Sequence, residues 1–291
     1  MRLRSIELEV TDRGAAAAFL ENTWGLIPTG SSDGTVYLRG TEDLPYIVSL
    51  AQAGAPAIAA VSFSGSAAEL DGVRSRAAMA GVRHSPVREF DEPGGSSGFF
   101  LEGPEGQVFR FVTDAPGTAG LPVDRDRPMQ ITHVVINARD RNTCTRFLVD
   151  VAGFRLSDRT AHMSFIRCDS VHHAIAFANA NVPSLNHVAF EMKDIDSVMR
   201  GIGRLRDAGY ASVWGPGRHG PGNNVFAYFV APFGAIVEYT SEVQRVDDRY
   251  KVGAPEDWKW PPNRVDHWGA SGRDNAAMAA TEGKFRFRPF A

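Results

Sequence analysis

The sequence predicts an α+β fold in which one unit, a strand followed by a helix and then by further strands, occurs four times. Residues 131–136 have the composition of a strand, residues 141–149 alternate as a helix can, and Gly153 follows as a break. The same order begins at three other places, and the closing strands of the two halves also match. A unit of this size must pack on its neighbours to bury its sheet, so the four units should form larger domains.

Each predicted unit contains a strand, a helix and a glycine that ends the helix. In chain order they are strand 5–10 with helix 15–20 and Gly25, strand 59–63 with helix 67–80 and Gly81, strand 131–136 with helix 141–149 and Gly153, and strand 185–190 with helix 197–208 and Gly209. We therefore expect the same chain path in all four units.

The closing strands of the two halves match position by position. The corresponding residues are separated by 128 positions, as Pro104 is from Pro232 and Gly106 from Gly234. Aromatic residues also coincide at the ends of the two segments. The chain is therefore interpreted as a duplicated pair of units.

Composition excludes several classes of protein. A chain of 291 residues with 43% hydrophobic content can bury a substantial core, and a net charge of -3 gives no reason to expect nucleic acid or an anionic membrane as partner. The N-terminus lacks the apolar core of a signal peptide, and no window approaches the roughly 18 apolar residues of a membrane helix. Two cysteines, Cys144 and Cys168, cannot build a disulfide scaffold, so we expect reduced thiols and a cytoplasmic protein.

Three matched positions differ in kind between the halves. Residues that cannot jointly bind a metal in the first half correspond to two imidazoles and one carboxylate in the second: Ile6 to His133, Ala60 to His187, and Arg110 to Glu238. Each of these positions lies in a predicted strand, so the three side chains could share one concave face. Two histidines and one carboxylate leave about three coordination positions open, which is the ligand set of non-haem Fe(II) oxygenases. The sequence therefore predicts a metal site in the second half alone.

The segment 217–238 contains a histidine, a tyrosine, a proline and glycine turn, and the candidate metal-binding glutamate. In order and spacing, His219, Tyr228 and Glu238 resemble the signature of the extradiol ring-cleaving dioxygenases of the vicinal oxygen chelate superfamily. The resemblance covers residues 1–245. It implies four βαβββ modules in two glyoxalase-like domains, each a curved mixed β-sheet with flanking helices.

The resemblance also implies that the two halves of the chain have different roles. We expect an N-terminal two-module domain without metal ligands at residues 1–122, with a seam near residues 116–128. A C-terminal two-module catalytic domain would occupy residues 123–245, followed by a tail at residues 246–291. Members of the family often form multimers, so a homo-oligomer is expected.

By the same resemblance, His133, His187 and Glu238 would hold Fe(II), or less commonly Mn(II). The segment 171–177 resembles the family segment that carries the acid–base histidine, and the match favours His173 over His172. A histidine with an ordinary pKa near ~6.5 can donate a proton and later take it back at neutral pH.

His219 and Tyr228 would hydrogen-bond the substrate oxygens. The expected reaction is cleavage of a catechol-type ring next to its hydroxyl pair, with dioxygen as the second substrate. Two alternatives stay open from the sequence. One is a metal-dependent enzyme of the same superfamily that resembles glyoxalase or an epimerase. The other is a non-catalytic protein that only binds aromatic molecules.

The remaining candidates have simpler interpretations. His84 and His162 have no motif around them, and Asn223 with Asn224 suits a turn better than a catalytic role. The tail has three tryptophans, at positions 258, 260 and 268, separated by polar residues. We expect it to cover a sheet or another subunit, and the alternative is that His267 or a tryptophan lines the mouth of the substrate site.

Overall fold

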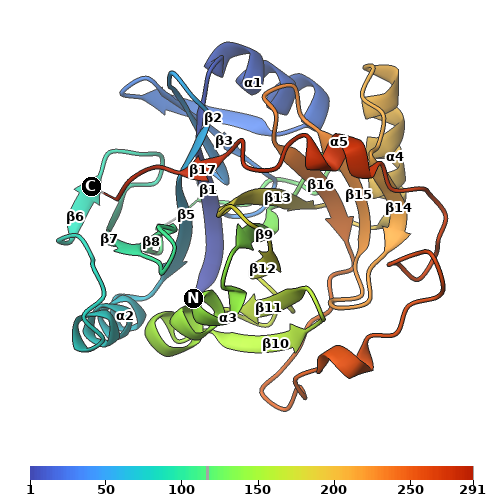
Figure 1. Cartoon of the computed structure of the whole chain (residues 1–291). Coiled ribbons are helices and arrows are strands. Elements are labelled where there is room, and N and C mark those ends of the chain that lie inside the picture. The colour runs from blue at the N-terminus through green and yellow to red at the C-terminus, as the bar shows by residue number, and fades with distance from the viewer. Residues whose placement is uncertain (116–117, 291) are drawn as a thin grey trace.

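The computed structural model describes residues 1–115 and 118–290, which form two curved mixed sheets with flanking helices (Figure 1). The first sheet has the order β2-β3-β4-β1-β5-β8-β7-β6, and the second has the order β10-β11-β12-β9-β13-β16-β15-β14. The two orders are the same path repeated eight strands later. This confirms the predicted α+β fold of two glyoxalase-like domains.

The first sheet consists of β1 (Arg2–Val10), β2 (Ile27–Ser32), β3 (Thr35–Arg39), β4 (Val48–Gln52), β5 (Ala57–Gly65), β6 (Arg88–Phe90), β7 (Ser96–Glu102) and β8 (Val108–Thr113). The second consists of β9 (Ile131–Ala138), β10 (Arg155–Arg159), β11 (Met163–Arg167), β12 (Ile175–Asn179), β13 (Ser184–Glu191), β14 (Trp214–Arg218), β15 (Val225–Val230) and β16 (Ile236–Ser241). Residues 116–117, at the start of the predicted seam, lie outside the described residues. The division into residues 1–122, 123–245 and a tail stays a prediction.

The α-helix of each module begins at a polar cap, and each module contributes one long or extended helix. They are α1 (Arg13–Phe19) continued by the π-helix η1 (Leu20–Trp24), α2 (Ala67–Met79), α3 (Arg141–Phe147) continued by the π-helix η2 (Leu148–Ala152), and α4 (Ile195–Asp207). The caps Asp12, Asp140 and Asp194 each accept a backbone N–H from the first helical turn. Gly25 ends η1 at a φ of 99°, where a side chain would also meet the backbone of Asp126.

One continuous apolar core joins the two sheets. Trp24, from the first half, is fully buried against aromatic rings of the second, and its ring stacks on Tyr239 with centroids 3.7 Å apart. The reciprocal contact is made by Phe154, which packs edge-on to Phe63 at 4.8 Å. Each half therefore places the end of its first helix on the sheet of the other half.

The tail covers the second sheet and then returns to the first (Figure 1). It contains the short 3-10 helix η3 (Pro255–Asp257), α5 (Asn275–Ala279) and β17 (Arg286–Phe287). β17 extends the first sheet by pairing in parallel with β5. In the described part of the chain, no helix is both long and apolar enough to cross a membrane. Both cysteines are free, and Cys144 is buried.

The register of the strands corrects one predicted equivalence. Ser5 pairs with Ser62, and His133 pairs with Ala189, which is the residue equivalent to Ser62. The counterpart of His133 in the first half is therefore Ser5 and not Ile6. Ile6 is 1% exposed in the apolar core, so it occupies the position of an aliphatic core residue. The number of positions between equivalent residues of the two halves is one larger for β1 and β9 than for their neighbours β5 and β13. The sequence comparison missed this difference.

Candidate active site

Three adjacent strands of the second sheet bring the predicted metal ligands together. Ala189 on β13 pairs with His133 on β9 at one side and with Glu238 on β16 at the other. His187 precedes Ala189 by two positions on the same strand, and residues two apart on a strand point to the same face. The pleat therefore directs all three side chains to one side of the sheet.

The three side chains converge closely enough to hold one ion. Glu238 Oε2 lies 3.3 Å from His133 Nε2 and 3.1 Å from His187 Nε2. One ligand atom from each of the three residues lies within 4.8 Å of the others. All three side chains are buried, and Glu238 is fully inaccessible. Such a spacing suits a cation between the three atoms better than direct hydrogen bonds.

The hydrogen bonds around these residues leave the inward atoms free. His187 Nδ1 is 2.8 Å from the side-chain oxygen of Asn186, so its N–H is donated there and the lone pair stays on Nε2. His133 Nδ1 is 2.9 Å from the hydroxyl of Thr132, which can accept its N–H in the same tautomer. His187 Nε2 and Glu238 Oε2 are buried without any hydrogen-bond partner. Buried polar atoms without partners are unfavourable unless an ion satisfies them, so the residues present fit a divalent metal.

The charge states also suit a metal. Burial alone would raise the pKa of Glu238, but His133 and His187 overcome this and lower it well below its ordinary value, so the group is a carboxylate. Burial lowers the pKa of His187, which keeps the imidazole neutral and able to donate its lone pair. A carboxylate and neutral imidazoles are the protonation states that metal binding requires.

His173 lies at the edge of this group, and His172 lies behind it. The ring of His173 is 4.2 Å from that of His133, measured between centroids, and it lines the same cavity. Burial, with the nearby His133, lowers the pKa of His173 well below its ordinary value, so the ring is neutral. His172 does not line the cavity and instead places Nε2 2.7 Å from Asp158. The geometry therefore favours His173 as the residue facing a substrate.

His219 and Tyr228 lie together on the other side of the metal ligands. His219 Nε2 is 2.7 Å from the hydroxyl of Tyr228, which pairs with Glu238 across β15 and β16. Burial lowers the pKa of His219 to about 3 and raises that of Tyr228 well above its ordinary value, so both are neutral at physiological pH. Trp214 stacks on Tyr228 and holds the pair in place.

A cavity of about 660 Å³ contains these groups. Its walls include all the candidate metal-binding and catalytic residues except the fully buried Glu238, and a set of residues from the tail, namely Pro255, Trp258, Trp260, Val265, Arg273, Asn275, Met278, Ala279, Thr281 and Glu282. Trp258 and Trp260 therefore line the cavity, as the alternative prediction for the tail stated, whereas His267 is not among the lining residues. His162, which had no motif, also lines the cavity.

Sequence reasoning missed three residues that support the ligands. Asn224 follows the turn residue Asn223, is fully buried, and donates from Nδ2 to Glu238 Oε1 at 3.3 Å and to Thr240 at 2.8 Å. The predicted turn near the pocket fits Asn223, at a φ of 48°, but the turn interpretation did not include this contact of Asn224 with Glu238. Thr132 and Asn186 each directly precede a histidine ligand. A polar residue before each ligand was the only signal available in the sequence.

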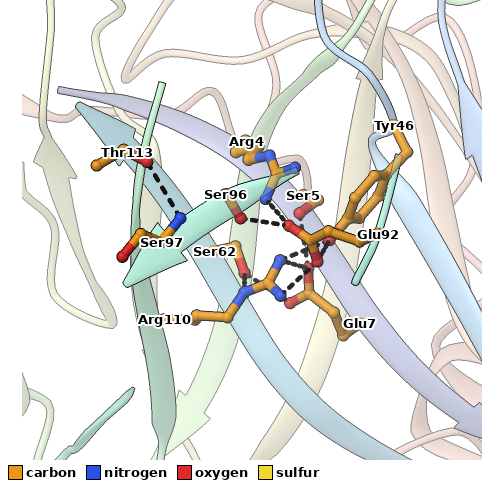
Figure 2. Close-up of polar contacts among 10 residues, drawn as sticks. All are labelled: Arg4, Ser5, Glu7, Tyr46, Ser62, Glu92, Ser96, Ser97, Arg110 and Thr113. Carbon is orange, nitrogen blue, oxygen red and sulfur yellow. Dashed lines mark hydrogen bonds and ion pairs between the residues drawn. The ribbon is translucent and has the colours of Figure 1, made fainter. Parts of the chain in front are cut away.

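The equivalent place in the first sheet is filled by a buried ion-pair network (Figure 2). Arg110, at the position of Glu238, donates to Glu92 Oε2 at 2.8 Å, to Glu7 Oε1 at 3.0 Å and to the hydroxyl of Tyr46 at 2.6 Å. Arg4 donates to the other oxygen of Glu92. Two guanidinium groups and two carboxylates balance in charge here, and the described residues of this half include no cluster that could hold a metal.

Comparison with known proteins identifies the family. The model of the Glyoxalase/Bleomycin resistance protein/Dioxygenase superfamily matches residues 130–239, the part of the chain that contains all three metal ligands. Metapyrocatechase 2 of Cupriavidus necator is 27% identical over 72% of this chain and 74% of that protein. An iron-dependent extradiol dioxygenase of Rhodococcus jostii is 25% identical over 85% of this chain and 92% of that protein.

A solved structure covers almost the whole chain. It is the Mn(II)-bound glyoxalase from Novosphingobium aromaticivorans, which is 34% identical, covers 95% of this chain and 93% of that chain, and superposes with a TM-score of 0.87. With a likeness of this extent and the family model above, the chain belongs to the glyoxalase/bleomycin resistance protein/dioxygenase superfamily.

Proposed function

We propose that this protein binds Fe(II) through His133, His187 and Glu238 and cleaves a catechol-type ring next to its hydroxyl pair with dioxygen. The observation that carries the proposal is the set of three buried ligands, with two inward atoms that have no other partner. Three protein ligands leave open positions on the metal for two further molecules. The relative from Rhodococcus jostii is named for its dependence on iron.

Iron bound at these residues would hold both oxygens of the diol, make them more acidic and allow electrons to pass from the ring to dioxygen. The roles of the surrounding residues follow from their positions. His173 is neutral and faces the ligands, so its ring would accept a proton from a substrate hydroxyl and return it later. The neutral Tyr228 and His219 would hydrogen-bond a substrate oxygen from the opposite side.

The walls of the cavity suit a flat aromatic substrate. Phe165 lies edge-on to His173 with centroids 5.1 Å apart, and Trp214 with Tyr228 forms a stacked pair on the other side. Aromatic rings prefer such offset or edge contacts with other rings. We propose a catechol-type diol and dioxygen as the substrates, in a cytoplasmic homo-oligomer that binds neither nucleic acid nor membrane.

A glyoxalase-type reaction is the second candidate, because the structure with 34% identity bears that name and contains Mn(II). The two candidates differ in their need for dioxygen. Metal-free protein should be loaded anaerobically with Fe(II), Mn(II) or Ni(II) and assayed in an oxygen electrode with a panel of catechols, and separately for isomerisation of a thiol adduct. Our proposal requires oxygen uptake with Fe(II). Activity with Ni(II) and no oxygen uptake would favour the alternative.

A further inference from the structure

A buried chain of hydrogen bonds leads from His173 away from the cavity. His173 Nδ1 lies 3.0 Å from His172 Nδ1, and His172 Nε2 lies 2.7 Å from Asp158 Oδ2. His172 and Asp158 are completely inaccessible, and His173 is 3% exposed. Because water does not reach these groups, each hydrogen atom in the chain must be placed by its neighbours.

The far end of the chain is held by the tail. Asp158 Oδ1 accepts the backbone N–H of Gly253 at 2.8 Å, and Oδ2 also accepts the hydroxyl of Tyr250 at 3.1 Å. All the partners of Asp158 are therefore donors, which is the arrangement that a carboxylate requires. His172 must donate from Nε2, and a neutral His172 then has its lone pair on Nδ1.

This fixes the hydrogen on the next ring. His172 Nδ1 acts as an acceptor, so His173 donates its N–H from Nδ1 and keeps its lone pair on Nε2. Because Nδ1 is engaged with His172, Nε2 is the ring nitrogen that remains for the cavity. Gly222 packs against both rings, and a side chain there would come within 3.1 Å of His173 and 3.2 Å of His172. The two rings are therefore closely packed where they meet Gly222.

We infer that Asp158 and His172 are positioning residues that fix the ring and the tautomer of His173, so that the nitrogen facing the substrate is a proton acceptor. The inference rests on the role proposed above for His173. The tail then has a second role besides covering the cavity. Gly253 and Tyr250 donate hydrogen bonds to Asp158 and hold its carboxylate in place.

The substitution Asp158→Asn tests the direction of the whole chain. The backbone N–H of Gly253 donates to Asp158 Oδ1 at 2.8 Å and, at a longer 3.3 Å, to the carbonyl of Ser157, so the amide oxygen of the asparagine would take the place of Oδ1 and its NH₂ would face His172. His172 would then accept at Nε2, donate from Nδ1 to His173, and force the hydrogen of His173 onto Nε2. The same reversal occurs when the buried aspartate of a Ser-His-Asp triad is replaced by asparagine.

The tautomers can be read directly by ¹⁵N NMR of the full-length chain, labelled at histidine and loaded with diamagnetic Zn(II). The wild-type protein should carry hydrogen on Nε2 of His172 and on Nδ1 of His173, and Asp158→Asn should reverse both. Wild-type protein with His172 protonated on both nitrogens, or His173 protonated on Nε2, would overturn the inference even if the variant fails to fold. This readout does not depend on which substrate the enzyme uses, so a failure of the proposed reaction remains distinguishable.

Turnover gives the second readout. Asp158→Asn should keep its Fe(II), lower kcat about 100-fold and change KM less than about threefold, since the loss concerns proton transfer. Ser157→Ala is the matched control, because Ser157 is an equally buried neighbour that binds Arg167 and lies outside the chain of hydrogen bonds. Reversed tautomers with an unchanged kcat, or equal losses in both variants, would contradict the positioning role.

Discussion

At the scale of single residues, the candidate site depends on which nitrogen of each histidine faces inward. Asn186 and Thr132 hold the outer nitrogens of His187 and His133, and the inner atoms are left for a metal. His173 is held in a similar way by a neighbouring side chain and does not belong to the ligand set. In the proposed function, the site therefore separates the candidate metal ligands from the candidate proton-transfer residue His173.

This separation predicts opposite phenotypes for two substitutions. His187→Ala should lose Fe(II) and therefore all turnover, whereas His173→Phe should retain Fe(II) and lower kcat by about 10²–10⁴. Metal content per chain and kcat measured on the same preparations check this. His84→Ala, in the other half of the molecule, is the control and should match the wild-type protein. Iron loss in His173→Phe would contradict the assignment.

The buried network around Arg110 makes a prediction about pH. Burial alone would raise the pKa of Glu92, but the guanidinium groups of Arg110 and Arg4 lower it to about 2, against an ordinary value of 4.5. Because the folded pKa lies below the unfolded one, this stabilisation is complete above about pH 4.5 and is lost as the pH falls towards 2. Glu92→Gln should therefore flatten the fall in unfolding free energy between pH 4.5 and 2.

The same network predicts a large cost for removing its central cation. Arg110→Met leaves Glu7 and Glu92 buried without their partner and should lower the unfolding free energy by about 3–5 kcal/mol, measured by denaturant titration. Arg200→Met breaks an exposed, solvent-screened pair with Asp126 and should change the unfolding free energy far less. Similar costs for the two variants would mean that the network contributes little.

At the scale of elements, the tail determines how closed the cavity is. Trp260 packs directly on Gly220, where even a methyl group would come within 2.4 Å of the indole ring. This contact places the tryptophan one residue away from His219. The tail, which contains only short helices and one short strand, therefore forms one wall of the site.

The tryptophans of the tail should differ in their effect on substrate binding. Trp260→Ala should raise KM for catechols at least about threefold and leave metal content unchanged, because it removes apolar wall area from the cavity. Trp268 is outside the cavity lining and packs under Arg218, so Trp268→Ala is the matched control. An unchanged KM in Trp260→Ala would show that the tail does not contact the substrate.

The sequence predicted the elements better than the connections between them. The duplicated order of strands, helices and glycine breaks was sufficient to predict both sheets and to choose three residues that converge, because the two halves could be compared position by position. Ile6 was predicted to be the first-half equivalent of His133. The reason is that the same separation between equivalent residues was applied to two different strands. Only pairing across the sheet distinguishes Ser5 from Ile6, and that pairing is not a local property.

The supporting shell could not be predicted for a similar reason. Asp158 is fourteen positions before His172 and meets it only through folding, with Gly253 brought in from the tail. Nothing near Asp158 in the sequence distinguishes it from a surface carboxylate. The contribution of Asn224 was hidden by its position beside a turn. Such residues act through partners that are distant in sequence, and periodicity carries no information about them.

At the scale of the whole molecule, the two halves stabilise each other across one core. Trp24 of the first half stacks on Tyr239, the residue that follows the ligand Glu238. Tyr239 in turn donates to the backbone carbonyl of Trp24, and Arg204 donates to the hydroxyl of Tyr239. The half without ligands therefore supports a strand of the metal site.

This arrangement predicts that the halves unfold together. Trp24→Ala should lower the unfolding free energy by about 3–5 kcal/mol and shift one single calorimetric transition. Two separated transitions, with only the first one shifted, would show that the halves are independent.

The central claim is that Fe(II) at His133, His187 and Glu238 allows dioxygen to open a catechol ring. The most direct test measures oxygen uptake and product absorbance together, with anaerobically iron-loaded protein and a broad panel of catechols. The account predicts one dioxygen consumed for each catechol that is converted to a yellow ring-opened product. Full iron occupancy without oxygen uptake on any catechol of the panel would contradict it.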